Sequence, residues 1–279
     1  MTVHEQTVRI AVDYGEIEGT VVTPGVLIPG VLFVHGWGGC QAQYLARARE
    51  VAALGCVCLT FDLGGHAGTQ PLRETVSRES NLADLVAAYD TLAAHPSVDA
   101  SAIAVAGSSY GGYLATILTT LRAVRWLGLR VPALYVDAGW ELPKLQLHKE
   151  HDLRSYRRNF VVAATNRALR ACAEFKGDVL LVQSEHDDII PPAVIQSYRE
   201  AFVQSTSLTY RCIGGADHGL STDASQRAYT GMLVQWLSEM LPSARRDPEA
   251  LAAASAAPRQ AAANAPVERE EPEAPPKVA

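Results

Sequence analysis

Short apolar runs alternate along the chain with stretches in which apolar residues recur every three or four positions. Residues 31–35, 56–61 and 102–106 are nearly continuous apolar runs, which is typical of strands buried on both faces of a sheet. Similar runs predict three further strands, at 131–136, 179–183 and 208–213. Helical spacing predicts helices at 41–54, 74–94, 110–121, 192–203 and 222–240. This alternation predicts a three-layer α/β fold with a mostly parallel, doubly wound sheet.

Three segments depart from the alternation. Residues 8–12 and 17–22 are strand-like and are joined by Asp13-Tyr14-Gly15, which predicts an antiparallel hairpin at one edge of the sheet. Residues 139–175 are too many for a simple crossover and are rich in Lys, Arg and His, so we expect a small helical cap. From residue 242 the chain consists mainly of Ala, Pro, Glu and Arg. This composition predicts a disordered tail at 242–279 after a single domain at 1–241.

The overall composition limits the class of protein. The 279 residues are 48% hydrophobic and 19% charged, as in globular proteins, and the net charge of −6 argues against a nucleic-acid partner. The first residues lack the pattern of a secretory signal, and no apolar stretch approaches the roughly 18 residues that span a bilayer. The five cysteines form no CxxC pair, so we expect reduced thiols. We therefore expect a cytoplasmic protein that binds neither nucleic acid nor membrane, and the oligomeric state stays open.

A Gly-x-Ser-x-Gly sequence, Gly107-Ser108-Ser109-Tyr110-Gly111, lies between a predicted strand and a predicted helix. A sharp strand-to-helix turn needs small residues on both sides, and it exposes the hydroxyl of its central serine at the carboxyl end of the sheet. The frame puts Ser109, and not Ser108, at that centre. We therefore predict that Ser109 is a nucleophile.

A second glycine-rich loop, His35-Gly36-Trp37-Gly38-Gly39, follows an earlier buried strand. Backbone N–H groups in such a loop can converge on a developing oxyanion. The predicted donors are the N–H groups of Trp37 and of Tyr110, the residue after the nucleophile. The other interpretation is a tight turn that needs glycine only for its backbone conformation. Trp37, Tyr110 and Trp140 are also candidate aromatic walls of a substrate-binding pocket.

The base and the acid are expected later in the chain. His218 lies in the glycine-rich loop 214–219 after the last predicted strand, and Asp187 follows the strand before it. Both therefore fall at the edge of the sheet where Ser109 is expected. A serine hydroxyl needs such a base, and the imidazole needs a carboxylate to fix its tautomer. Asp188 and Asp137 also follow strands and stay open as alternative acids.

The motifs resemble those of the α/β-hydrolase superfamily over about residues 6–240. The Ser-Tyr-Gly-Gly-Tyr elbow at 109–113 is similar to that of the prolyl oligopeptidase and acylaminoacyl-peptidase catalytic domains and of related bacterial esterases. Residues 61–68 are similar to a D-x-R-G-H-G loop of the superfamily. Here Gly64 replaces the arginine and Ala67 replaces the last glycine.

The resemblance also implies roles for later residues. Such relatives place the acid before an x-x-V-P sequence, and Asp187 matches that frame because Ile190 and Pro191 follow it. Asp217-His218 matches a D-H loop of the family. His35 and His66 match structural positions in the family's loops.

Motifs and resemblance together predict a serine hydrolase that needs no cofactor and no metal. We expect it to cleave a small or medium carboxylic ester through an acyl-enzyme. A peptidase of the aminopeptidase or acylaminoacyl-peptidase type stays open, although such relatives usually carry a large N-terminal propeller, which we do not expect here. A non-catalytic homologue that binds a small ligand is the third possibility.

Several residues of the predicted cap have two interpretations. His148 and His151 are neighbours on a helix and suggest metal ligation, but no third ligand is evident, so a solvated helix is expected. The basic side chains either form a solvated face or recognise an acidic group of the substrate. They are Lys144, Lys149, Arg154, Arg157 and Arg158.

Overall fold

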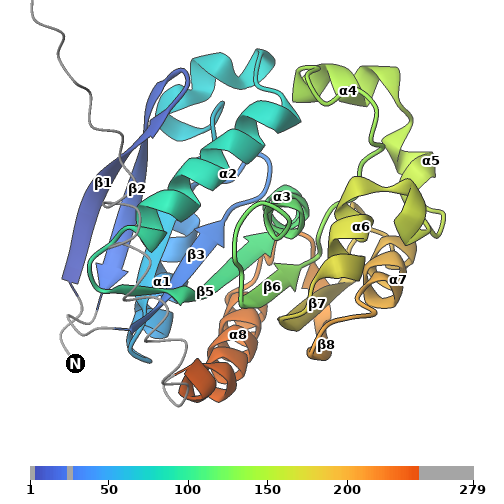
Figure 1. Ribbon diagram of the computed structural model, residues 1–279. Helices are drawn as coiled ribbons and strands as arrows, with labels where there is room; N and C mark the ends of the chain where they lie inside the picture. Colours follow the sequence, from blue (N-terminus) through green and yellow to red (C-terminus); the bar gives the residue numbers. More distant parts are fainter. Residues whose placement is uncertain (1–3, 24–27, 245–279) are drawn as a thin grey trace, which may run out of the picture.

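The computed structural model describes residues 4–23 and 28–244, which form one eight-stranded sheet with helices on both faces (Figure 1). The strands are β1 (His4–Val12), β2 (Gly15–Thr23), β3 (Ile28–Val34), β4 (Val57–Phe61), β5 (Val98–Ser108), β6 (Trp126–Arg130), β7 (Asp178–His186) and β8 (Ser207–Asp217). Their order is β1-β2-β4-β3-β5-β6-β7-β8, and the neighbours from β4 onward are parallel. β1 and β2 are antiparallel, and β2 pairs antiparallel with β4. The predicted sheet and its N-terminal hairpin are confirmed.

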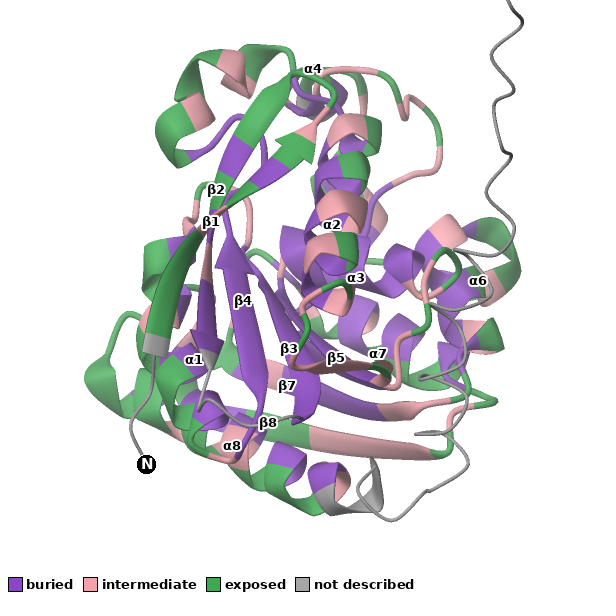
Figure 2. Cartoon of the chain, turned by 60° about the vertical axis from the view of Figure 1, so that its left-hand side comes forward, coloured by how far each residue is buried: buried purple, intermediate pink, exposed green. Residues whose placement is uncertain are grey.

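Helices cover both faces of the sheet. One face carries α1 (Leu45–Ala52) and α8 (Asp223–Ala244); the other carries α2 (Arg78–Ala93), α3 (Tyr110–Leu118), α6 (Arg167–Glu174) and α7 (Pro192–Ala201). In β3, Leu32 and Val34 belong to the core under α2 and α3, whereas Val31 and Phe33 belong to the core under α1 and α8. Successive side chains of a strand point to opposite faces, so β3 and β4 are buried along their whole length (Figure 2).

The prediction of a strand at 131–136 is wrong. The strand is β6, which ends at Arg130, and residues 131–136 form a largely buried loop. Val131 ends the strand with φ +39°, a conformation that a β-branched residue rarely adopts. The N–H of Val131 donates to the carbonyl of Val182, and that of Ala133 donates to the carbonyl of Ser109. The loop is apolar because it is buried, and its backbone is satisfied without a strand.

The segment predicted as a cap has two parts. The first contains the short helices α4 (Lys144–Glu150) and α5 (Leu153–Arg157), followed by the 3₁₀ turn η3 (Ala163–Thr165). The second part, α6, packs against α3 and α7 beside the sheet, as a crossover helix does. Of the basic side chains in the segment, Lys144 and Arg157 are buried and are not part of a solvated face. Lys149, Arg154 and Arg158 are exposed.

The C-terminal part of the chain begins as helix. α8 extends to Ala244, so the first residues of the predicted tail are helical, and residues 245–279 lie outside the described residues. No helix among the described residues combines the length and the apolar character needed to cross a membrane. None of the five cysteines, all of which lie within the described ranges, forms a disulfide.

A buried carboxylate attaches the N-terminal hairpin to α2. The hydroxyl of Tyr14, at the turn between β1 and β2, donates a hydrogen bond of 2.6 Å to Asp84 Oδ1. Asp84 Oδ2 accepts the N–H of Gly64 at 2.8 Å and the Nδ2 of Asn81 at 3.1 Å. Burial raises the pKa of Asp84, and these three donors oppose that rise. The charged form of the Asp84 side chain is therefore stabilised by these three hydrogen bonds.

We predict that Tyr14→Phe lowers the free energy of unfolding by about 1–3 kcal/mol, because it leaves the buried Asp84 carboxylate short of one donor. Urea denaturation followed by circular dichroism measures the change. Tyr210→Phe is the control: it removes a hydroxyl that donates 2.6 Å to the amide oxygen of Gln183 at a half-buried site. That loss is expected to be smaller, and an equal loss in both variants would contradict the role of Asp84.

Candidate active site

Ser109 lies at the turn between β5 and α3 and has an unusual backbone conformation, with φ 50° and ψ −115°. A positive φ is uncommon for a residue with a side chain, and at such a turn it directs the serine away from the sheet. A Cβ on Gly111 would overlap the carbonyl oxygens of Val34 and His35, and a Cβ on Gly107 would come 2.6 Å from the carbonyl oxygen of Gly111. Gly107 and Gly111 are therefore required because no larger residue would fit at either position.

Backbone hydrogen bonds hold this turn in place. The N–H of Ser109 donates to the carbonyl of Arg130 at 2.9 Å. The carbonyl of Ser109 accepts the N–H of Tyr113 at 3.1 Å and that of Ala133 at 2.9 Å. The end of β6 and the buried loop after it thus support the turn from the neighbouring position in the sheet.

The structure brings His218 and Asp187 to Ser109. His218 follows β8, and its Nε2 lies 3.1 Å from Ser109 Oγ. Asp187 follows β7, and its Oδ2 lies 2.7 Å from His218 Nδ1. The other oxygen of Asp187 accepts the N–H groups of Ile189 and Ile190 at 2.9 and 2.8 Å. The Asp187 side chain is 2% exposed and that of His218 is 19% exposed, so water reaches the imidazole more easily than the carboxylate.

The other candidate acids have different surroundings. Asp188 is exposed. Asp137 accepts the N–H of Arg167 at 2.8 Å and pairs with Arg170 Nη2 at 3.0 Å. Asp187 is thus the carboxylate that is hydrogen-bonded to His218. Among the described residues no three His, Cys, Asp or Glu side chains gather as a metal site requires, and the side chain of His148 is outside that description.

The predicted oxyanion donors, the N–H groups of Trp37 and Tyr110, belong to two segments that meet at Ser109. Tyr110 is the first residue of α3, so its N–H has no acceptor within the helix. The 35–39 loop approaches the same point, since a Cβ on Gly36 would lie 3.3 Å from Ser109 Cβ. The N–H of Gly38 is already bonded to His66 Nε2 at 3.0 Å, and the next N–H is bonded within the loop. The N–H of Trp37 is therefore the candidate oxyanion donor of this loop.

Two buried imidazoles join the 35–39 loop to the loop after β4. His35 Nε2 accepts the N–H of Leu63 at 3.0 Å, and its Nδ1 lies 2.8 Å from the carbonyl of Gly36. His66 Nε2 accepts the N–H of Gly38, while its Nδ1 faces carbonyls of its own loop. Each ring thus accepts at Nε2 and donates at Nδ1, which requires the neutral form. Burial lowers the pKa of both histidines to about 4, which favours that form near neutral pH.

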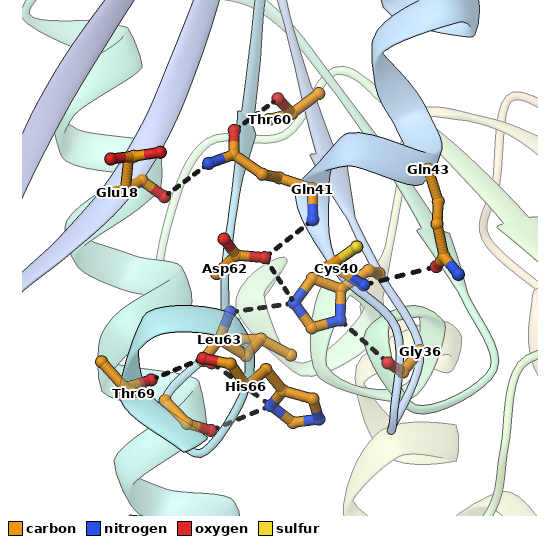
Figure 3. Close-up of polar contacts among 12 residues, drawn as sticks. Glu18, Gly36, Cys40, Gln41, Gln43, Thr60, Asp62, Leu63, His66 and Thr69 are labelled. Atoms are coloured by element: carbon orange, nitrogen blue, oxygen red, sulfur yellow. Dashed lines mark hydrogen bonds and ion pairs between the residues drawn. The ribbon is translucent and has the colours of Figure 1, made fainter. Parts of the chain in front are cut away.

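Gln41 and Asp62 extend this network beneath the loop (Figure 3). The N–H of Gln41, the first residue of the 3₁₀ turn η1 (Gln41–Tyr44), donates to Asp62 Oδ1 at 2.7 Å. The side chain of Gln41 accepts the hydroxyl of Thr60 at 3.1 Å and donates to the carbonyl of Glu18 at 3.3 Å. These bonds tie η1 to β4 and β2, so Asp62 holds the loop in position.

A cavity of about 360 Å³ opens beside Ser109. Trp37 and His218 line it, as expected for residues of one site. Two buried arginines, Arg47 on α1 and Arg130 at the end of β6, also line the cavity, and the sequence analysis did not identify them. For Arg130, the sequence did contain a signal: a charged residue at the end of a buried strand suggests a functional role, because burying a charge is costly. This signal was missed because the strand was predicted at 131–136, which does not include Arg130.

Two residues predicted as pocket walls do not line this cavity. The ring of Tyr110 is fully buried, and its hydroxyl donates to Asn81 Oδ1 at 3.1 Å. It packs edge-on against Trp37, with 5.6 Å between the ring centroids. Trp140 stacks on Tyr113, with 6.2 Å between centroids. Tyr110 therefore supports Trp37 from inside the protein, and Trp140 belongs to the aromatic cluster behind it.

Lys144 connects the cap to the Trp37 loop. It begins α4 and is 1% exposed. Its ammonium lies 4.1 Å from the centroid of the Trp37 ring and 4.8 Å from that of Tyr110, within the range of cation–π attraction. Burial lowers the pKa of Lys144, and the charge and hydrogen bond of Tyr135 oppose that effect. The ring of Trp37 is thus held between Tyr110 and the cap.

Comparisons with known proteins agree with this architecture. Residues 43–244 match the model of the prolyl oligopeptidase family. Alpha/beta hydrolase domain-containing protein WAV2 of Arabidopsis thaliana is 24% identical over 227 residues, which are 78% of this chain and 73% of that protein. A dienelactone hydrolase from Anabaena variabilis is similar with a TM-score of 0.63 and 19% identity, over 86% of this chain and 100% of the other. An acylaminoacyl peptidase from Pyrococcus horikoshii has a TM-score of 0.65 and 18% identity, over 86% of this chain and 42% of the other.

The structure explains one of the two departures from the D-x-R-G-H-G loop, Gly64, and shows that the other, Ala67, has a strained backbone. A Cβ on Gly64 would overlap the hydroxyl of Tyr14 and lie 2.9 Å from Asp84 Oδ2. The hairpin turn therefore occupies the space that a side chain at position 64 would need. At Ala67, φ is 44°, a conformation that glycine adopts without strain and alanine does not.

We predict that Ala67→Gly raises the free energy of unfolding by up to about 2.5 kcal/mol. Relief of backbone strain of about 1–3 kcal/mol is partly offset by about 0.4–1 kcal/mol of added chain entropy in the unfolded state. Gly68→Ala is the control, because a Cβ there would meet nothing within 4 Å and the φ of Gly68 is not positive. It should leave stability unchanged or slightly raised. Thermal and urea unfolding test both variants, and a destabilised Ala67→Gly protein would contradict the assignment of strain.

Proposed function

The chain belongs to the prolyl oligopeptidase family. We propose that it is a serine hydrolase that cleaves small or medium carboxylic esters through an acyl-enzyme. Its fold is that of the α/β hydrolases. The observation that carries the proposal is the hydrogen-bonded chain from Ser109 through His218 to Asp187, with distances of 3.1 and 2.7 Å. In this proposal Ser109 is the nucleophile, His218 the base and Asp187 the acid that orients the base.

In the first half of the reaction, Ser109 Oγ attacks the carbonyl carbon of the ester while His218 Nε2 takes the hydroxyl proton. Asp187 accepts the hydrogen bond from Nδ1–H, which keeps Nε2 basic and then stabilises the imidazolium. The carbonyl oxygen becomes an oxyanion, which the N–H groups of Trp37 and Tyr110 stabilise. Cleavage of the ester bond releases the alcohol, which takes the proton from His218, and Ser109 is left acylated.

The second half repeats these roles with water. His218 Nε2 removes a proton from a water molecule as its oxygen attacks the acyl carbon, and the same two N–H groups stabilise the new oxyanion. The bond to Ser109 Oγ then breaks, His218 returns the proton to that oxygen, and the carboxylic acid leaves. The cavity beside Ser109 provides space for one part of the substrate.

A peptidase is the second candidate, because the family and the similar Pyrococcus horikoshii enzyme are both named for peptide cleavage. The ester proposal draws support from the Anabaena variabilis dienelactone hydrolase, which is similar over its whole length and is named for a lactone, a cyclic ester. Parallel assays with 4-nitrophenyl esters and aminoacyl-naphthylamides separate the two. Turnover of the amides alone would overturn the ester proposal.

We predict that Ser109→Ala lowers ester turnover on the order of 10⁶-fold and leaves the fold intact. Ser108→Ala should retain most activity, because the Ser108 hydroxyl accepts a hydrogen bond from Arg130, whereas Ser109 Oγ is the hydroxyl next to His218 Nε2. Peptide mass spectrometry after fluorophosphonate treatment should find the adduct on Ser109. An adduct on Ser108 would refute the assignment, and an unlabelled wild-type protein would favour a non-catalytic, ligand-binding homologue.

We predict that Asp187→Asn lowers turnover by roughly 10⁴-fold, because the amide holds the wrong imidazole tautomer. The neighbouring Asp188→Asn is the matched control, since Asp188 is exposed and should give only a small loss. Both variants are assayed on the same ester, and circular dichroism verifies their folding. A large loss in Asp188→Asn, or no loss in Asp187→Asn, would show that another group orients His218.

A further inference from the structure

The cavity beside Ser109 is lined by two positive charges and by no negative one. Arg47 and Arg130 line it, and none of its lining residues is Asp or Glu, although the whole chain has a net charge of −6. Arg47 is 9% exposed and Arg130 is 7% exposed. Burial of a guanidinium without a counter-charge is unfavourable, so this pair requires an explanation.

Carboxylates do not supply the missing counter-charge within the part of the chain that the structure describes. The arginines that pair with Asp or Glu there are Arg49, Arg122 and Arg170, and none of these lines the cavity. Two further basic residues, Lys144 and Arg157 of the cap, were candidates from the sequence for recognition of an acidic group. Both are buried near Tyr135 and do not line the cavity. The positive charge in the cavity therefore comes from α1 and β6.

Neutral groups fix the direction of Arg47. Its Nε donates to Thr230 Oγ1 on α8 at 3.1 Å, and its guanidinium lies 4.6 Å from the ring centroid of Tyr229 and 5.4 Å from that of Tyr44. Among the described residues its two Nη atoms donate no hydrogen bond. The side chain is thus held in place with its two outer nitrogens available to a ligand.

Arg130 links the same cavity to the base. Its Nε lies 3.3 Å from Ser108 Oγ, and its Nη1 donates to the carbonyl of His218 at 2.8 Å. Its guanidinium lies 5.7 Å from the ring of Tyr229, the ring that also supports Arg47. A group bound by both arginines would therefore sit close to the point where Ser109 attacks.

We propose that the substrate carries an oxyanion group, a carboxylate or a phosphate, near the ester bond, and that Arg47 and Arg130 bind this group in the cavity beside Ser109. Guanidinium groups form charge-assisted, often bidentate hydrogen bonds with both kinds of oxyanion. The bound anion supplies the counter-charge that the cavity lacks. The inference rests on the proposed function, because it takes Ser109 as the point of attack.

Two pairs of esters test the inference on either side of the ester bond. Mono-4-nitrophenyl adipate and 4-nitrophenyl hexanoate differ in that a carboxylate replaces a methyl group in the acyl part. The pair 4-carboxyphenyl butyrate and phenyl butyrate places the carboxylate in the alcohol part. The wild-type protein should have a kcat/KM about tenfold or more higher for the anionic member of at least one pair, after subtraction of uncatalysed hydrolysis.

Variants then assign the preference to the cavity. Arg47→Gln should remove most of the preference, mainly by lowering kcat/KM for the anionic ester, and Arg47→Lys should retain part of it because the charge remains. Arg49→Gln is the matched control: Arg49 lies on the same helix but is half-exposed and pairs with Glu5, so this variant should keep both the preference and the activity. Glutarate and inorganic phosphate, used as competitive inhibitors of hexanoate hydrolysis, show which oxyanion the cavity favours.

The inference is overturned if the wild-type protein prefers the neutral ester in both pairs, or if the preference survives unchanged in Arg47→Gln. If fluorophosphonate labels Ser109 and hexanoate is hydrolysed in those cases, the proposed hydrolase stands and only its specificity is refuted. If the protein neither labels nor hydrolyses any ester, the proposed function fails. In that case the arginine site is still testable, because binding needs no turnover. Isothermal titration calorimetry measures the binding of glutarate and of inorganic phosphate to the Ser109→Ala variant. If neither anion binds, the arginine site is refuted.

Discussion

Where β5 turns into α3, the first turn of the helix lies so close to the end of β3 that no side chain fits between them. Gly111 meets the carbonyl groups of Val34 and His35 there, and any Cβ would overlap them. This approach brings the 35–39 loop, which continues β3, against Ser109. It also brings the loop that contains Trp37 close to the start of α3, where the first N–H groups have no acceptor within the helix. Both candidate oxyanion donors thus depend on one contact between a helix and a strand end.

The 35–39 loop is mostly glycine, so its position is determined by what surrounds it. From inside, His66 accepts one of its N–H groups and Tyr110 packs against Trp37. From the cap, Lys144 lies over the same tryptophan ring. The imidazoles that hold the loop act as neutral acceptors, whereas the cavity in front of it contains cationic arginines. The site therefore combines an uncharged support with a charged binding space.

The local parts of this site could be predicted from the sequence, because they follow from spacing along one segment. The Ser109 turn is defined by five consecutive residues, and Asp187 and His218 follow strands whose ends meet at one sheet edge. Arg47 was not predictable in this way, since its role depends on contacts with Tyr229 and Thr230, 183 residues away in the case of Thr230.

Apolar composition also gave one wrong prediction, the strand at 131–136. Residues 131–136 are apolar because they are buried behind the Ser109 turn, and composition alone does not distinguish such a loop from a strand. Tyr110 shows a second limit of prediction from sequence. The motif predicts the position of its backbone, but the direction of its ring depends on packing, and the ring points into the protein.

The position of β8 has a consequence for the synthesis of this protein. β8 is at the edge of the sheet, pairs with β7 alone, and carries His218 just beyond its end. His218 is 109 residues later in the chain than Ser109, so a ribosome completes the turn with the serine well before it makes the imidazole. Until that last strand emerges and docks, the hydroxyl of the proposed nucleophile has no imidazole beside it to remove its proton. Under the proposed mechanism, a chain that ends before His218 would therefore be inactive.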